Sequence, residues 1–128
     1  HLLYVRKMKM WFEYDQNNSG GSFTLDRVKG IGPRVWIEAP TLNVANARAE
    51  DIGIYFNGVA DGYDCGCCGD RWSEPWQEGV EVPNINPKYD FTWHNEVYFH
   101  KLDGTLVTLK QDGTVTGDKQ LQITKVGE

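Results

Sequence analysis

The sequence lacks the long hydrophobic runs and leader patterns that identify membrane or secreted proteins. No stretch approaches the roughly 18 consecutive apolar residues of a membrane span, so we expect no membrane association. The opening HLLYVRKMKM has too short an apolar core for a secretory signal, and its positive charges follow the apolar residues. Repeats and low-complexity segments are absent, and 40 % hydrophobic residues suffice for a sizeable core. We therefore expect a single domain over residues 1–128, with residues 1–7 as an N-terminal extension before a start at Met8 or Met10.

Basic residues are nearly missing between residues 50 and 81. This segment holds eight acidic residues and one base, Arg71, so its net charge is −7, whereas the rest of the chain is +2. A protein that binds nucleic acid in general would carry a basic stripe. We therefore expect no general nucleic-acid binding. A cation or the basic surface of a partner suits the acidic segment better.

Sequence signatures of enzymes are also missing. The chain has no phosphate-cradling loop, no nucleophile elbow and no H-E-x-x-H motif. Its acidic residues are too many and too scattered to name a catalytic pair. An enzyme that uses a thiol or a metal-activated water is therefore the least favoured alternative.

Cysteine occurs nowhere except in the run DCGCCGDRW, residues 64–72. Three thiols cannot all pair within one chain, and a disulfide between the neighbours Cys67 and Cys68 would strain the peptide that joins them. The pattern therefore favours a reducing compartment, and we expect a cytoplasmic protein.

The cysteines have the spacing of a metal site. Cys65-x-x-Cys68-Gly69 matches a zinc knuckle, whose turn directs two thiolates at one metal. With Cys67 as a third ligand, one position of a Zn²⁺ ion would remain for a nearby aspartate or a histidine. The alternative is that the cysteines are small buried hydrophobic residues in a glycine-rich turn, although core cysteines are usually scattered. Neighbouring aspartates would raise the pKa of a thiol, which disfavours thiol catalysis.

Histidine is the weak part of this metal hypothesis. His94 and His100 are six residues apart, about 20 Å on one extended strand, so they cannot share a metal there. We expect His94, beside Trp93 at the start of a strand, to be the better ligand. A site shared between two chains would also supply the missing ligand and would make the protein a homodimer.

Arg71 and the nearby tryptophans have two interpretations. In the structural one, Arg71 pairs with an acidic residue of its own segment and the tryptophans fill a small loop core. In the functional one, the guanidinium binds a phosphate or carboxylate while tryptophan rings stack on a base. The residues of this candidate ligand site are Arg71, Trp72, Trp76 and Trp93.

Local patterns predict an α+β fold. We expect a strand over 8–14 with residues 22–28 as its hairpin partner, and a strand over 35–39. A helix over 43–51 should be capped by Thr41 or Asn43 and end at Gly53.

The second half of the chain is predicted to hold a long loop and a hairpin. Residues 62–88 show little periodicity, which is typical of a functional or tethered loop. Residues 96–110 form two alternating runs around Asp103-Gly104, a strong hairpin signal. A final strand follows over 121–126. The predicted architecture is an antiparallel sheet with one main helix and a long irregular Cys/Trp-rich loop.

The run IEAPTLNVANARAEDIGIYFNGVADGYDCGCCGDRW, residues 37–72, resembles small uncharacterised proteins of tailed bacteriophages, including phages of cyanobacteria. The common pattern is an IEAP-type strand end, an Ala/Glu-rich helix, a G-I-Y-F-x-G-V exit and a D-C-x-C-C-G-D-R-W loop. The resemblance implies a phage accessory protein that acts in the infected cell, and it implies no activity.

These observations together predict a binding module and not an enzyme. We expect a phage-encoded accessory protein for host takeover or counter-defence, in the cytoplasm of the infected host cell, whose cysteine cluster binds zinc. Its partner would be a host protein or a small molecule. One alternative is a sequesterer of a small nucleotide signal that uses Arg71 and the tryptophans, although the charge of −7 counts against it. Another alternative is a minor virion protein.

Overall fold

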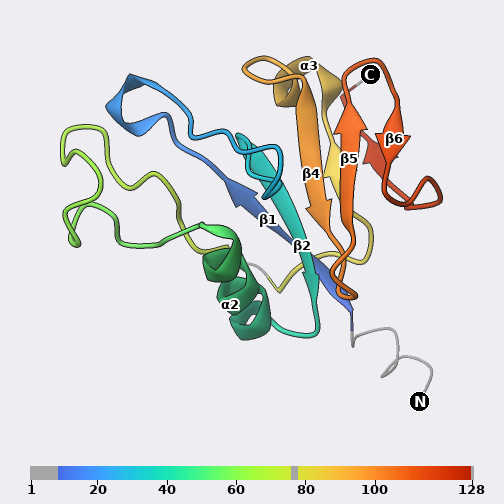
Figure 1. Cartoon of the computed structure of the whole chain (residues 1–128), viewed down its shortest axis with the longest axis horizontal. Helices are drawn as coiled ribbons and strands as arrows, with labels where there is room; N and C mark the ends of the chain where they lie inside the picture. The colour runs from blue at the N-terminus through green and yellow to red at the C-terminus, as the bar shows by residue number, and fades with distance from the viewer. Residues whose placement is uncertain (1–8, 76–77, 128) are drawn as a thin grey trace.

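The computed structural model describes residues 9–75 and 78–127 and has an α+β fold (Figure 1). A five-stranded sheet has the order β1-β2-β4-β5-β6, and β3 and β7 form a second, two-stranded sheet. The elements in chain order are β1 (Met10–Asp15), the 3-10 turn η1 (Ser19–Gly21), β2 (Arg34–Ala39), α2 (Leu42–Ile52), β3 (Asn84–Ile85), α3 (Pro87–Asp90), β4 (Glu96–His100), β5 (Leu106–Lys110), β6 (Val115–Thr116) and β7 (Thr124–Lys125). Within the described ranges, no helix combines the length and apolar character needed to cross a bilayer.

The partner of β1 differs from the predicted one. β1 pairs antiparallel with β2, with Glu13 opposite Trp36, and the predicted hairpin with residues 22–28 is wrong. The reason is burial, because β2 contributes four buried side chains to the sheet. Residues 22–28 would contribute few, since Leu25 and Val28 are 48 % and 91 % exposed. Apolar burial therefore selects the more distant segment.

The main sheet is mixed and not purely antiparallel as predicted. β2 and β4 pair in parallel, with Trp36 opposite Phe99. Parallel neighbours need a long crossover connection, and α2 with the irregular segment after it provides that connection. The predicted hairpin is confirmed: β4 and β5 pair antiparallel, and Gly104 in the turn has a φ of 93°.

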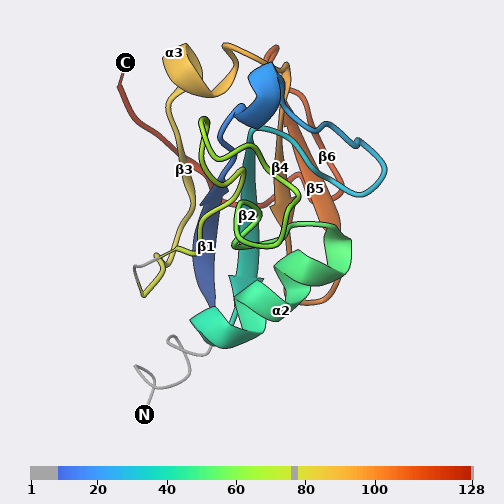
Figure 2. The same ribbon diagram turned by 90° about the vertical axis from the view of Figure 1, so that its left-hand side faces the viewer.

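Helix α2 has the predicted caps. The Thr41 Oγ1 accepts a hydrogen bond from the Val44 N–H at 3.2 Å, so Thr41 is the N-cap. Gly53 ends the helix with a φ of 111°, and its N–H donates to the Ala49 carbonyl. Ala45 and Ala49 are fully buried, and these small side chains let α2 pack closely on β2 (Figure 2).

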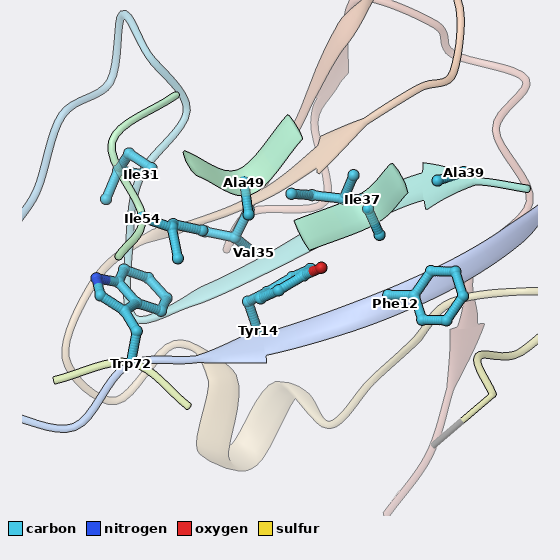
Figure 3. Packing of buried hydrophobic residues seen from close by; sticks show 10 residues of the cluster. Phe12, Tyr14, Ile31, Val35, Ile37, Ala39, Ala49, Ile54 and Trp72 are labelled. Atoms are coloured by element: carbon cyan, nitrogen blue, oxygen red, sulfur yellow. The ribbon is translucent and has the colours of Figure 1, made fainter. Parts of the chain in front are cut away.

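One face of β1 and β2 forms a core with α2. Tyr14 of β1 and Val35 and Ile37 of β2 are directed toward Ala49 of the helix (Figure 3). Trp72 packs at the end of this cluster and is 2 % exposed. This core holds the irregular segment after α2 against the sheet.

The opposite face of the sheet forms a second core. Trp11, Trp36 and Phe99 lie on it, and the Trp11 and Phe99 rings meet edge to face with centroids 6.2 Å apart. Ile85 of β3 and the C-terminal segment cover these rings. The predicted strand over 121–126 is shorter than expected, because only Thr124–Lys125 forms β7, which pairs in parallel with β3.

Replacing the N-cap gives a direct test of the helix boundary. We expect Thr41→Ala to lower the free energy of unfolding by about 1 kcal/mol, because the Val44 N–H loses its acceptor. Asn43→Ala is the matched control, since Asn43 lies inside the helix and should change stability by less than about 0.5 kcal/mol. Urea unfolding followed by circular dichroism measures both. The opposite order would show that the helix starts at Asn43.

Candidate functional site: the cysteine loop

Residues 57–71, here called the cysteine loop, extend from the end of the core furthest from β5 and β6 (Figure 1). The sulfur atoms of Cys65, Cys67 and Cys68 all lie within 4.8 Å of one another, and all three residues are exposed. The closest pair, Cys67 and Cys68, has its sulfurs 3.7 Å apart. The alternative of separately buried structural cysteines is therefore wrong.

A tight backbone turn gathers the sulfurs. The Cys65 carbonyl accepts hydrogen bonds from the N–H groups of Cys68 at 3.2 Å and Gly69 at 3.1 Å. Gly69 has a φ of 85°, a left-handed conformation that favours glycine. The Cys-x-x-Cys-Gly spacing therefore forms one compact turn, as the sequence predicted.

Two aspartate carboxylates, one of them buried, fix the loop that carries this turn. Asp64 accepts hydrogen bonds from the Tyr55 hydroxyl and from the Arg71 backbone N–H, both at 2.8 Å, and its side chain is 1 % exposed. A Cβ at Gly58 would overlap the Asp64 carboxylate, so only glycine fits there. Asp70 accepts a hydrogen bond from the Val59 N–H at 2.8 Å. Both aspartates therefore stabilise the loop and are engaged in these contacts.

Arg71 anchors the loop to the segment that follows β1. Its Nη1 donates to the Gln16 Oε1 at 2.9 Å and to the Ser22 carbonyl at 2.7 Å, and its Nη2 donates to the Ser19 carbonyl at 2.6 Å. Its Nε lies 3.8 Å from the Asp64 carboxylate, and the side chain is only 12 % exposed. Both Nη atoms of the guanidinium thus donate to oxygens of the protein, which agrees with the structural interpretation. A phosphate could not bind to both Nη atoms without displacing these hydrogen bonds.

Asn17 holds the cysteine turn from the other side. Its Nδ2 donates to the Cys68 carbonyl at 2.7 Å and to the Asp70 carbonyl at 3.3 Å, and its backbone N–H donates to the Arg71 carbonyl at 2.7 Å. The sequence analysis missed this residue, because Asn17 sits in a run of turn-forming residues, DQNNSGG, that offers no signal for a long-range partner.

The tryptophans of the candidate ligand site do not gather around Arg71. Trp72 is a core residue, so its ring face is not available to stack on a base. Trp93 is 69 % exposed, and its ring lies against Phe23 with centroids 6.1 Å apart. Trp76 lies outside the described residues. The fold itself uses the side chains of both Arg71 and Trp72, which disfavours the prediction that they bind a ligand together.

His94 does not join the cysteines. Its Nε2 lies 3.0 Å from the Tyr98 hydroxyl, which donates to the Glu96 carboxylate at 2.6 Å, and burial lowers the pKa of His94. Among the described His, Cys, Asp and Glu residues, the three cysteines are the one group of three or more whose ligand atoms all lie within 4.8 Å of one another. His94 therefore cannot be their fourth ligand in this conformation, because Tyr98 of β4 holds its side chain.

The thiols of Cys65 and Cys67 differ in acidity because each is affected by its contacts with neighbouring cysteines. Hydrogen bonds from the Cys67 side chain and backbone lower the pKa of Cys65. Hydrogen bonding to Cys65 and Cys68 raises the pKa of Cys67 to about 11. One thiolate forms easily and further negative charge is resisted, which is the situation that a bound cation reverses. The three sulfurs lie close enough together to hold a metal ion.

The fold and the site define an α+β protein with a rigidly mounted, exposed three-cysteine turn. The chain belongs to a family described as a domain of unknown function (DUF7296), whose family model matches residues 9–119. The match includes the whole cysteine loop and the strands from Met10 of β1 to Thr116 of β6. No curated protein and no solved structure matches the chain.

Alkylation should follow the order of thiol acidity. At pH 8, in the presence of a chelator and after removal of reductant, we expect iodoacetamide to modify Cys65 faster than Cys67. The reason is that with a pKa of about 11 roughly a thousandth of Cys67 is thiolate, whereas the pKa of Cys65 is lowered. Timed quenching and peptide mass spectrometry give the three rates. The rates should converge in denaturant, and equal rates in the folded protein would contradict the proposed contacts.

Removing the Arg71 anchor should weaken the whole fold. Arg71→Met leaves the carbonyls of Ser19 and Ser22 without this donor and the buried Asp64 carboxylate without its cationic neighbour, so we expect the free energy of unfolding to fall by about 3 kcal/mol. Arg27→Met is the matched control: the Arg27 side chain is 64 % exposed, and its loss should cost less than about 1 kcal/mol. Equal losses in denaturant unfolding of the two variants would refute the anchoring role.

Proposed function

We propose that this protein is a small phage-encoded accessory binding protein of the infected cell's cytoplasm, and that its cysteine loop binds Zn²⁺ through Cys65, Cys67 and Cys68. The phage origin rests on the resemblance of residues 37–72 to bacteriophage proteins. The metal rests on the grouping of the three sulfurs within 4.8 Å. The protein acts by binding and not by catalysis.

The observation that carries this proposal is a difference among the side chains of DCGCCGDRW: some contact the rest of the fold, whereas the sulfur atoms are exposed. Asp64, Asp70, Arg71 and Trp72 each contact other parts of the fold and are explained by stability alone. The sulfur atoms contact one another and solvent. A loop held by so many contacts, with its thiols left outside, is suited to present those thiols to a ligand.

Sulfur donors favour zinc or another soft metal over magnesium or calcium. Zinc usually takes four ligands, and within residues 9–75 and 78–127 no histidine or carboxylate completes the group of three. The fourth position is therefore open to a ligand from outside, such as a side chain of a host protein or of a second copy of this chain. A shared metal would make binding to the partner depend on zinc.

The nucleotide-sequestering alternative is less favoured. Its central cation, Arg71, already donates to Gln16, Ser19 and Ser22, and the ring of Trp72 is buried. A phosphate would have to displace three hydrogen bonds and then enter a segment of net charge −7.

Metal analysis tests the proposal. We expect the purified protein to retain about one zinc per chain, and Cys65→Ser and Cys68→Ser to fall below about 0.2, because each variant loses one of only three donors. Ser73→Ala is the matched control, an exposed residue of the same irregular segment that should retain the metal. Substitution by Co²⁺ should give thiolate-to-cobalt charge-transfer absorption in the wild type and lose it in the cysteine variants.

Two further measurements interpret this result. Circular dichroism should show the serine variants folded, because the loop is also held by Asp64, Arg71 and Asn17. Sedimentation with and without zinc distinguishes a second copy from a different partner as the source of the fourth ligand. A wild-type protein with less than about 0.2 metal per chain and three freely titratable thiols would refute the metal proposal.

A further inference from the structure

A cavity of about 250 Å³ lies beside the outer edge of β1. Two bridges attach the chain after the cysteine loop to this edge, one from Trp72 to Gln16 and one from Val80 to Trp11. Trp72 to Val80 spans eight residue steps, whereas Trp11 to Gln16 spans five, so the two segments differ in length between the attachments. The cavity lies between these attachments, and its lining includes Glu74 and Gly79.

The cavity has aromatic walls and only acidic charges. Trp11, Phe12 and Trp36 are among its lining residues, and the charged residues of its lining are Glu13, Asp15 and Glu74. Trp36 lies directly across the β1–β2 pair from Glu13. Its indole Nε1–H is the one buried side-chain donor without a hydrogen-bond acceptor within the described residues. Buried polar groups normally have a partner, so this part of the cavity wall has an unsatisfied N–H group.

The protein neutralises the acids of the cavity only in part. The Arg34 Nε lies 2.9 Å from both the Glu13 and the Asp15 carboxylates, and its Nη1 lies 2.7 Å from Asp90 of α3. One guanidinium thus faces three carboxylates, which leaves two negative charges in excess when all three are ionised. Glu74 adds a further carboxylate, and its Oε1 accepts a hydrogen bond from the neutral Asn46 amide at 2.7 Å.

We propose that this cavity binds an organic cation, a protonated amine or guanidinium carried on a short apolar stem. The carboxylates of Glu13 and Glu74 attract the charge, and the aromatic rings contact the stem and the cation face. Drug-sized ligands occupy pockets of roughly 300–1,000 Å³, so a cavity of about 250 Å³ suits one basic side chain or a small amine and is too small for a nucleotide. The site is separate from the cysteine loop and does not depend on metal.

The protonation of Glu13 links this binding to pH. Burial and the neighbouring Asp15 raise the pKa of Glu13 to about 7, and Arg34 opposes them only in part, while Asp90 raises it further. Below pH 7 Glu13 is mainly neutral and attracts a cation weakly, and above pH 7 it is charged. Affinity for a cation should therefore rise as the pH increases from 6 to 8, and the bound cation should lower the pKa of Glu13.

Titration with simple probes tests the site in the protein of residues 1–128. We expect n-butylammonium and n-butylguanidinium to shift the indole N–H signals of Trp11 and Trp36 saturably in NMR spectra, with affinity about tenfold higher than for neutral 1-pentanol. Glu13→Gln and Glu74→Gln should each weaken cation binding by about three- to tenfold. Glu13→Gln should also remove most of the rise between pH 6 and 8. Glu50→Gln, an exposed acid of α2, is the matched control and should change nothing.

A second titration, with short peptides, identifies the source of the cation. Acetyl-Gly-Lys-Gly-amide is compared with its norleucine counterpart and with the free amines. Tighter binding of the lysine peptide supports a basic side chain of a protein partner, and tighter binding of the free amine supports a small metabolite. Glu74 is not among the acids that contact Arg34. The Glu74→Gln variant therefore still measures the contribution of a carboxylate to binding if Glu13→Gln unfolds the protein. Any of three results would overturn the proposal. These are the absence of saturable shifts with every probe, equal binding of 1-pentanol and the cations, and unchanged cation binding in both glutamine variants.

Discussion

The fork of hydrogen bonds from Arg71 is the constraint on which the candidate metal site depends. Arg71 is the only base between residues 50 and 81, and its guanidinium joins the end of the cysteine loop to the segment after β1. The three carbonyl and amide oxygens that it contacts come from residues 16–22, far away in sequence. The irregular loop therefore gains a fixed position without any regular secondary structure of its own, since each hydrogen bond replaces a contact that a strand or helix would otherwise provide.

The loop separates the atoms that stabilise it from the atoms that it presents. The Asp64 carboxylate and the Arg71 guanidinium, each of which would be costly to bury alone, lie 3.8 Å apart with side chains 1 % and 12 % exposed. The sulfurs, which tolerate burial well, are exposed. This reverses the arrangement that burial preferences alone would give. It is the physical reason for treating the cysteines as the functional part of the motif.

Both candidate sites depend on the same edge of the sheet. Backbone hydrogen bonds join this edge to Arg71 through Asn17 and to Val80 through Trp11. Near Arg71, the Asn17 side chain also holds the cysteine turn. The acidic, aromatic cavity lies between the Arg71 and Val80 attachments. An edge strand of this kind has unpaired backbone groups on one side. Here an irregular segment covers part of that side and creates two sites of different chemistry.

The sequence by itself determined the features that depend on neighbours along the chain. Thr41 and Gly53 bound the helix, Asp103-Gly104 joins β4 and β5, and the Cys-x-x-Cys-Gly spacing forms a turn, because each rests on contacts within a few residues. Only the tertiary structure decided which strand pairs with β1, that β2 and β4 run in parallel, and that Trp72 is core. It also decided that His94 bonds to Tyr98 and that Asn17 holds the cysteine turn. Each of these outcomes depends on which of several distant segments occupies a given buried surface or hydrogen-bond partner. Patterns of neighbouring residues contain no information about that choice, because it depends on the relative stability of whole arrangements of the chain.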